Sequence, residues 1–431
     1  MSLMPQNEAP AEAEQPHAPD QPRSGGRGRW LVRGAFLLLA LVALIPLGDA
    51  VAAMRIVPAA SPLVALASAI ATRSLQVVWV VGFALLLAAV VRRRWFCRWV
   101  CPTGLCADTA SWVGARLGRG SVPLPPVGSW ILLITLGGAA VGYPLLLWLD
   151  PLALLAGAAA TGDRAATAVV WWSGVPLAAV LALSLAFPRL WCVRLCPAGA
   201  LQDLAAEVKS LARRGTSPPQ RQAWAARGFR LTRRAAASGL IGWGWAALVM
   251  RGRRASARPL RPPGALDEAA FPGVCIRCGN CLRICPAGVI EPEMGEGGIA
   301  SFLAPRVRFV DDYCREDCVL CTEACPSGAL GSVTVEEKVR AKMGVVRVDM
   351  DVCLLGDNRD CAACLSHCPY EAIRFVFCEE DYTLTPHIDP ARCPGCGACE
   401  IACPTEPIKA IVVVPPAACG PPGHCAPTGR S

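Results

Sequence analysis

The sequence predicts an α-helical membrane domain of four transmembrane helices with an internal repeat, followed by an α+β domain built from two cysteine-rich modules. Three observations predict this fold class: four apolar segments in the first half, a Cys-containing motif that occurs twice among them, and four tight cysteine groups in the second half. The net charge changes sign between the halves, from +18 over residues 1–261 to −9 over residues 262–431. The two halves are therefore expected to lie in different surroundings.

The chain divides into five predicted parts. Residues 1–29 are rich in Pro, Gly, Gln and Glu and are expected to form a disordered tail. Residues 30–205 form the membrane domain, and residues 206–262 form a basic linker that contains a fifth apolar segment. Residues 263–414 form the cysteine-rich domain, and residues 415–431 form a second disordered tail.

The four apolar segments are predicted to cross a membrane. They cover about residues 34–53, 75–91, 127–148 and 168–187, and these lengths are close to the ~20 residues that a crossing needs. Basic residues flank the N-terminus and fill alternate connections, with ten Lys and Arg between Pro188 and Arg234. The positive-inside rule places the N-terminus and both basic connections in the cytoplasm, so we expect a multi-pass protein with membrane lipid as its surroundings.

An internal repeat runs through this region. The stretch SPLVALASA at residues 61–69 is similar to DPLALLAGA at residues 150–158, and FCRWVCPTGLCAD at 96–108 is similar to WCVRLCPAGALQD at 191–203. Both copies contain Cys-x-x-x-Cys-Pro, with Cys97 and Cys101 in the first and Cys192 and Cys196 in the second. Residues i and i+4 share a helix face, so the four thiols are expected to converge between the repeats.

The predicted role of these four thiols is redox chemistry or cluster binding. One such motif alone would be explained by packing, because Cys behaves as a small hydrophobe. Two at matching places favour function, although the spacing does not decide between a cluster and working thiols. Cys106 has no counterpart in the second copy, where Leu201 stands, and is interpreted as packing.

Several functions are excluded or disfavoured by what the sequence lacks. None of the four His lies in an apolar segment, so we expect no haem held by paired His ligands inside the membrane. No Gly-rich nucleotide fingerprint follows a strand, and no nucleophile–base pair is recognisable. Membrane topology explains the basic half, so nucleic acid is not expected as a partner.

The fifth apolar segment lies between two pairs of Arg residues at about residues 230–254. Thr-Arg-Arg followed by a mild Gly- and Ala-rich run resembles a twin-arginine export signal, which would carry a folded, cofactor-loaded domain across the membrane. A cytoplasmic amphipathic linker is the alternative.

Sixteen of the 24 Cys fall into four groups, each of which ends in Cys-Pro. Groups one and four follow the bacterial [4Fe–4S] run C-x2-C-x2-C-x3-C-P, group two has a three-residue first gap, and group three has a seven-residue first gap. The groups are Cys275, Cys278, Cys281 and Cys285; Cys314, Cys318, Cys321 and Cys325; Cys353, Cys361, Cys364 and Cys368; and Cys393, Cys396, Cys399 and Cys403. Zinc sites and disulfide frameworks rarely repeat this spacing, so the pattern predicts four [4Fe–4S] clusters.

Short β-rich pieces separate the groups, at residues 345–350, 373–377 and 408–414. Each run is expected to continue into a short helix-like step, as in PAGVI at 286–290, PSGAL at 326–330 and PYEAI at 369–373. This order is the ferredoxin pattern, and it predicts a polyferredoxin domain of two dicluster ferredoxin-like modules. In such modules the Cys before Pro serves the neighbouring cluster. Group one can pair with two and three with four, or one with four and two with three.

These motifs carry a resemblance over about residues 30–412. The first half resembles the membrane ferredoxin-type subunit that feeds electrons to periplasmic nitrate reductase, on its four crossings and its motifs at Cys97/Cys101 and Cys192/Cys196. The second half is similar to the soluble four-cluster companion of that subunit and to the methylamine-utilisation ferredoxin. The chain therefore looks like a fusion of the two, and the seven-residue gap after Cys353 departs from the usual pattern.

The resemblance implies an electron-transfer component of a quinol dehydrogenase in the bacterial inner (plasma) membrane. Electrons would pass from quinol, with quinone as a possible cofactor, through four clusters to a periplasmic redox enzyme or cytochrome, and the ferredoxin domain would face the periplasm. Two alternatives stay open: a cytoplasmic polyferredoxin or maturation factor whose membrane half is an anchor, and a redox sensor based on the four membrane thiols.

Overall fold

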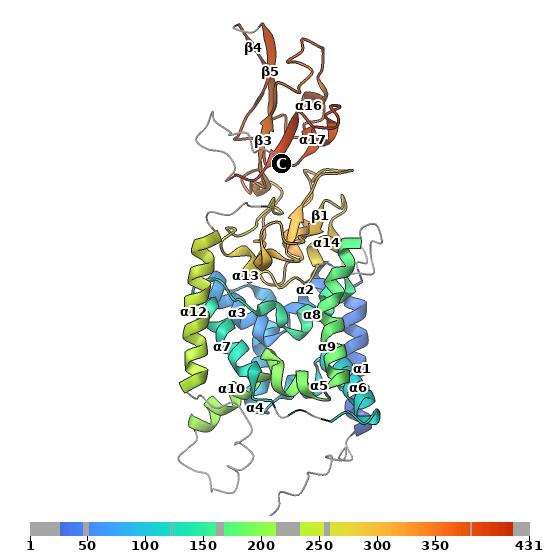
Figure 1. Ribbon diagram of the computed structural model, residues 1–431, viewed down its shortest axis with the longest axis vertical. Helices are drawn as coiled ribbons and strands as arrows, with labels where there is room; N and C mark the ends of the chain where they lie inside the picture. Colours follow the sequence, from blue (N-terminus) through green and yellow to red (C-terminus); the bar gives the residue numbers. More distant parts are fainter. Residues whose placement is uncertain are drawn as a thin grey trace, which may run out of the picture.

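The computed structural model describes residues 26–45, 51–120, 122, 124–160, 168–212, 233–253, 259–379 and 382–416. These residues form three tiers (Figure 1): a helical block, a first module on one end of the block, and a second module beyond the first. The predicted tail at 415–431 lies almost wholly outside the described residues, as does most of 1–29, although helix α1 already begins at Gly26.

The helical block contains both copies of the repeat. The first copy and the two helices before it comprise α1 (Gly26–Ala43), α2 (Val51–Ala59), α3 (Pro62–Thr72), η1 (Val77–Trp79), α4 (Val80–Val91), α5 (Trp95–Trp99) and α6 (Pro102–Arg116). The second copy and its neighbours comprise α7 (Val127–Ala140), η2 (Leu147–Leu149), α8 (Pro151–Ala159), η3 (Ala168–Gly174), α9 (Val175–Ala186), η4 (Trp191–Leu195), α10 (Pro197–Ala212) and α12 (Arg233–Arg253).

The helices of the block are shorter than the predicted segments. Within the part of the chain that the structure describes, no single helix is both long and apolar enough for a membrane crossing, and α2 with α3 meets that test only as a pair bent by 93°. The segment expected at 34–53 is divided between α1 and α2, and the segment expected at 127–148 leaves the α-helix after Ala140. Pro46 and Gly48, which are poor helix formers, stand between the first two helices in the sequence.

The two repeats are joined by two N-cap residues, one at the start of the short helix α3 and one at the start of the short helix α8. Ser61 caps α3 and Asp150 caps α8. The Ser61 hydroxyl donates to the Asp150 carboxylate, which also accepts the backbone N–H of Leu152 at 2.9 Å. All three groups are buried, so related positions of the two copies satisfy each other's polar groups inside the block.

The longer helices of the repeats exchange partners. Helix α6 of the first copy packs on α9 of the second, and α10 of the second packs on α4 of the first. A Cβ at Gly114 would lie only 2.1 Å from the carbonyl oxygen of Leu185, so α6 and α9 touch backbone to backbone. The Lys209 ammonium donates to the carbonyl of Val90 at 3.1 Å and ties α10 to α4.

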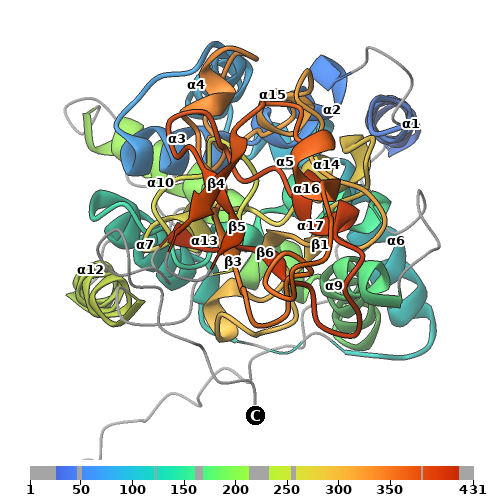
Figure 2. The ribbon, with the colours of Figure 1, turned by 90° about the horizontal axis from the view of Figure 1, so that it is seen from above.

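Helix α12, the fifth apolar segment, packs along α7 and lies on the opposite side of the block from α1 (Figures 1 and 2). Glycines make the contact close: a Cβ at Gly137 would meet the carbonyl oxygen of Gly239 at 2.1 Å, and a Cβ at Gly242 would meet that of Ile134 at 2.4 Å. The Thr232 of the twin-arginine-like motif lies outside the described residues.

The two modules are built from small antiparallel sheets and short helices. The first module pairs β1 (Ile290–Pro292) with β2 (Pro305–Val307). The second pairs β3 (Val345–Val348) with β6 (Ile411–Val414), and β4 (Ile373–Cys378) with β5 (Thr383–Ile388). The three strands expected from the β-rich pieces are therefore present as β3, β4 and β6, whereas β1, β2 and β5 were not predicted.

The expected helix-like steps after each Cys-Pro are wrong. Residues 286–290, 326–330 and 369–373 contain turns, bends and extended chain. The helical turns come earlier, inside each cysteine group: α14 (Asn280–Ile284), α15 (Leu320–Glu323), α16 (Ala363–Ser366) and α17 (Ala398–Ala402). Proline disfavours helix for the residue before it, so each helix has to end by the fourth Cys.

Candidate functional site

The sixteen cysteines of the four groups line four separate pockets, four thiols to a pocket. We name the pockets by their distance from the helical block. The first pocket has Cys275, Cys278, Cys281 and Cys325; the second has Cys285, Cys314, Cys318 and Cys321; the third has Cys368, Cys393, Cys396 and Cys399; the distal pocket has Cys353, Cys361, Cys364 and Cys403. Every pocket therefore takes three thiols from one group and the fourth from another.

This exchange of the fourth thiol resolves how the groups pair. Cys285 leaves its own group for the second pocket, and Cys325 enters the first. Cys368 and Cys403 exchange in the same way between the third and distal pockets. Group one thus pairs with two and group three with four, and the nested alternative is not the arrangement of this fold.

Local backbone geometry explains why the first three thiols of a group stay together. Gly279 and Gly397 adopt left-handed conformations, with φ of 71° and 87°, directly before α14 and α17. Glycine reaches this region without steric cost, so the chain reverses between the second and third Cys. The helical turn that follows then carries the third thiol back to the same pocket.

The fourth thiol is sent elsewhere by the Cys-Pro pair. Cys285 and Cys403 are extended, with ψ of 111° and 123°, and end α14 and α17. Backbone amides then meet the exchanged thiols: Leu330 donates to the Cys325 sulfur and Ala372 to the Cys368 sulfur, both at 3.3 Å. Such hydrogen bonds to ligand sulfurs tune the potential of an iron–sulfur centre.

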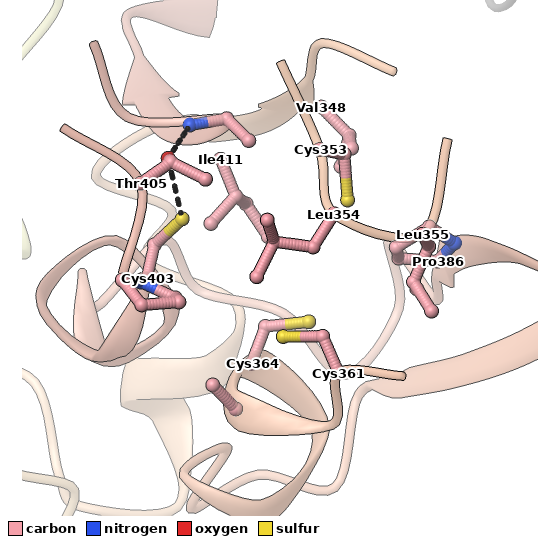
Figure 3. A pocket seen from close by; sticks show the side chains of 13 residues that line it. Val348, Cys353, Leu354, Leu355, Cys361, Cys364, Pro386, Cys403, Thr405 and Ile411 are labelled. Carbon is pink, nitrogen blue, oxygen red and sulfur yellow. Dashed lines mark hydrogen bonds between the residues drawn. The ribbon is translucent and has the colours of Figure 1, made fainter. Parts of the chain in front are cut away.

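The chemistry of the pockets fits [4Fe–4S] clusters. Burial raises the pKa of the free thiols of Cys278 and Cys396 to about 12, so they ionise at neutral pH only when a positive centre is bound. In the distal pocket the thiols lie around a hollow among Leu354, Ile411 and other apolar side chains (Figure 3). Among the described residues, no three His, Cys, Asp or Glu side chains are arranged to hold a single metal ion.

The four pockets form a series. A backbone hydrogen bond joins the second and third pockets, since the Cys314 N–H donates to the Cys396 carbonyl at 3.0 Å. Met343 lines the second pocket and packs against Cys396. Figure 1 shows α16, which carries Cys364 of the distal pocket, farther from the helical block than α17, which carries Cys399 of the third.

The first pocket lies directly on the helical block. The buried indole of Trp79 donates to the carbonyl of Pro326 at 2.8 Å, next to the thiol of Cys325. The Asn280 amide donates to the carbonyl of Met54 in α2 at 2.9 Å, and Ser173 of the block lines the pocket itself. No sequence signal singled out Trp79, because a Trp near an apolar segment is common at membrane interfaces.

The four thiols of the repeat motifs gather at the other end of the block, where Figure 1 places α5, α6 and α10. Burial raises the pKa of the Cys101 thiol. The neighbouring thiols of Cys97, Cys196 and Cys192 raise this pKa further. The Gln202 amide donates to the Cys97 sulfur at 2.9 Å, which links the two copies. We call Cys97, Cys101, Cys192 and Cys196 the thiol quartet.

The route by which the quartet converges differs from the prediction. Cys97 and Cys101 do not share one helix: Cys97 lies in α5, whereas Cys101 is extended and caps α6, with its sulfur accepting the N–H of Gly104 at 3.3 Å. Cys192 and Cys196 are separated in the same way, since Cys196 ends η4 with ψ of 118°. The Cys-Pro pair again ends the first helical piece.

Ion pairs surround the quartet. Arg93 and Arg94 both contact Asp203 of the other repeat, at 2.8 and 2.6 Å. Arg33 of α1 contacts Asp108, the residue that corresponds to Asp203 in the first copy, at 2.7 Å. Asp108 and Asp203 occupy equivalent positions of the two copies, but the repeat pattern does not indicate their partners, because the arginines come from other parts of the chain.

Two family models each match the chain twice. A model described as a 4Fe-4S dicluster domain matches residues 274–329 and 359–406, which contain all of the pocket cysteines except Cys353 of the distal pocket. A model described as a 4Fe-4S binding domain matches residues 75–120 and 169–215, which contain the two halves of the thiol quartet. Each pair of matches coincides with one of the two duplications, and the regions of the first model support [4Fe–4S] clusters in the modules.

Several curated proteins are similar to this chain over part of its length. The methylamine utilization ferredoxin-type protein MauM of Methylobacillus flagellatus is 35% identical over 186 residues, which is 40% of this chain and 76% of that protein. The ferredoxin-type protein NapG of Escherichia coli (strain K12) is 35% identical, over 38% of this chain and 73% of that protein. NapF of the same organism is 30% identical, over 38% and 91%. No solved structure matches the chain.

Proposed function

We propose, because this chain belongs to the ferredoxin-type protein family of MauM and NapG, that it is the electron-transfer component of a membrane-bound quinol dehydrogenase with a periplasmic redox partner. It is an iron–sulfur electron-transfer protein of ferredoxin type.

Four [4Fe–4S] clusters, one in each pocket, are the proposed cofactors, with the sixteen pocket cysteines as ligands. A cluster bound in a pocket supplies a one-electron carrier. The residues of the chain hold it by four thiolates, exclude water with apolar side chains such as Leu354 and Ile411 in the distal pocket, and donate backbone N–H groups to the sulfurs of Cys325 and Cys368.

The series of the pockets is the observation that carries the proposal. The first pocket rests on the helical block through Trp79 and Asn280, and the distal pocket lies in the module farthest from the block. A line of redox sites that starts at a membrane domain and ends at a remote tip suits transfer between a lipid-soluble donor and a partner in solution. Oxidation of quinol to quinone supplies two electrons and releases two protons.

The proposed orientation places the modules in the periplasm of a cell with an inner membrane. Described basic residues after the second and fourth apolar segments, such as Arg93, Arg94 and Lys209, belong to the end of the block that holds α5, α6 and α10, and the modules lie on the opposite end. Positive residues favour the cytoplasmic side. Helix α12 then returns the chain from the basic end to the end with the modules.

Anaerobic reduction by quinol tests the proposed function. The full chain is reconstituted in lipid nanodiscs, a short-chain quinol is added, and the visible iron–sulfur absorption is followed, with dithionite added at the end to reduce every cluster. We expect quinol to bleach a substantial share of the absorption that dithionite bleaches. Bleaching by dithionite alone would refute quinol as donor and leave a membrane-anchored polyferredoxin.

A further inference from the structure

The distal pocket differs from the other three in the segment that covers it. The chain between Cys353 and Cys361 has seven residues, where groups one and four have two. We call residues 354–360 the distal loop. It begins with Leu354 and Leu355, which line the pocket, and then turns outward, so that Asp357, Asn358, Arg359 and Asp360 are exposed.

The distal loop has a defined shape. The N–H of Gly356 donates to the Cys353 carbonyl at 2.9 Å and the N–H of Arg359 to the Leu354 carbonyl at 2.9 Å. A Cβ at Gly356 would lie 2.1 Å from the carbonyl oxygen of Met350, so the loop is folded tightly against the chain that precedes the pocket. Its exposed half is therefore held in place beside the thiols of Cys353 and Cys361.

Charge and apolar surface around the distal pocket are arranged as in a transient docking site. The exposed charged residues of segments 351–361 and 403–408 are Asp351, Asp357, Asp360 and Glu406, against the single cation Arg359. The ammonium of Lys409, the next residue, donates a hydrogen bond to the carbonyl of Cys403 at 2.6 Å. Two exposed apolar side chains are close in the chain to pocket cysteines: Leu365, at 39% exposure, follows Cys364, and Ile408, at 59%, lies five residues after Cys403. A small apolar centre with a charged rim suits short-lived redox encounters.

We infer that the distal loop and the surface beside it, including Asp351 and Glu406, form the docking site for the electron acceptor, a redox protein whose cofactor edge is ringed by Lys and Arg. The inference rests on the proposed function, because it takes the distal pocket as the last site of the series. Acidic side chains beside the distal pocket attract the basic rim of the acceptor and raise the rate at which the two proteins meet. Exposed apolar side chains such as Leu365 and Ile408 would exclude water where they meet the partner.

Carbodiimide cross-linking tests the docking site without any electron transfer. The oxidised full chain is mixed with a basic monohaem cytochrome c, whose haem edge is ringed by lysines, and the carbodiimide joins carboxylates to lysines that touch them. Mass spectrometry is expected to place the links at Asp357, Asp360 and Asp351. Links that fall chiefly on acidic residues of the first module, such as Asp311 or Glu336, would overturn the inference.

A kinetic comparison supplies matched variants. D357N/D360N removes two charges from the distal loop, and D311N/E336Q removes two exposed charges from the first module. With dithionite-reduced protein of equal iron content, D357N/D360N is expected to slow reduction of the cytochrome about three- to tenfold at ~10 mM salt and little at ~300 mM. D311N/E336Q is expected to match the wild type at both.

The outcomes separate this inference from the proposed function. The docking site would be refuted if both double variants slowed reduction of the cytochrome equally. It would also be refuted if the wild-type rate of this reduction did not depend on salt concentration. Because dithionite is the donor here, failure of quinol to reduce the protein leaves these rates unaffected. An acidic c-type cytochrome serves as the second probe, and we expect it to react slowly and to be accelerated by D357N/D360N.

Discussion

At the scale of single residues, the Cys-Pro pair is the device that this chain uses most often. The residue before a proline is pushed toward extended backbone, and Cys101, Cys196, Cys285 and Cys403 have ψ between 110° and 123°. In the modules this ends a helix and sends the fourth thiol to the neighbouring pocket. In the helical block it ends α5 or η4 and turns the second thiol of each motif toward its counterpart.

Replacement of one thiol from each half of the quartet tests whether it takes part in electron input. We expect C97S/C192S to slow quinol-driven bleaching at least about tenfold, because single ligand-shell changes commonly cost 10–100-fold, while bleaching by dithionite persists. C106S is the matched control, since Cys106 lies on α6 outside the quartet. An unchanged quinol rate in C97S/C192S would favour a sensor role for these thiols.

At the scale of elements, α12 is held by its glycines. It contacts α7 through Gly239 and Gly242, and the Gly242 position leaves no room for a side chain. Close approach of backbones through small residues is a common way for helices to associate in lipid. This packing favours a segment that remains part of the protein, and the export role of the twin-arginine-like motif stays a prediction.

A pair of glycine substitutions tests that contact. G242L places a side chain against the backbone of Ile134, whereas G244L, on the same helix, meets nothing within 4 Å. Overpacking of this kind costs about 1–3 kcal/mol, so G242L is expected to lower the melting temperature of the detergent-solubilised protein, measured by dye-monitored unfolding. G244L is expected to melt like the wild type. Equal stability of both variants would contradict a packed α7–α12 seam.

At the scale of the whole molecule, charge and architecture are aligned. The described residues 26–253 of the basic half form the helical block, and the described residues of the acidic half form the two modules stacked on one end of it. An acidic tip is suited to partners that carry positive charge, because complementary fields raise encounter rates more than they raise affinity. The quartet lies at the end of the helical block that is opposite to the modules, so its cysteines are separated from the cysteines of the pockets.

Reporter fusions test the proposed side of the membrane. Alkaline phosphatase fused after Ser431 is expected to be active in a bacterial host, because that enzyme folds only where its disulfides form. A fusion after Arg119, in the basic connection that follows the second apolar segment, is the control and is expected to be inactive. An inactive Ser431 fusion of normal abundance would place the modules in the cytoplasm.

Much of the site was predictable because its chemistry depends on local spacing. Three cysteines two or three residues apart can reach one cubane only from a tight loop, so the cluster type could be predicted from the letters of groups one and four. The strands at residues 345–348, 373–378 and 411–414 could be predicted from runs of Val, Ile and Phe. The helix-like steps expected after Cys-Pro are absent because proline disfavours helix for the residue before it, so each helical turn ends by the fourth Cys.

The sequence by itself determined the two duplications, the sixteen pocket cysteines as a set and the division of charge, because each depends on residue types at fixed separations along the chain. Only the tertiary structure decided which group lends its fourth thiol to which pocket, that Ser61 meets Asp150, and that Trp79 reaches the carbonyl beside Cys325. The two hydrogen bonds join residues that are 89 and 247 positions apart in the chain. Local spacing carries no information about which distant segments fold against each other.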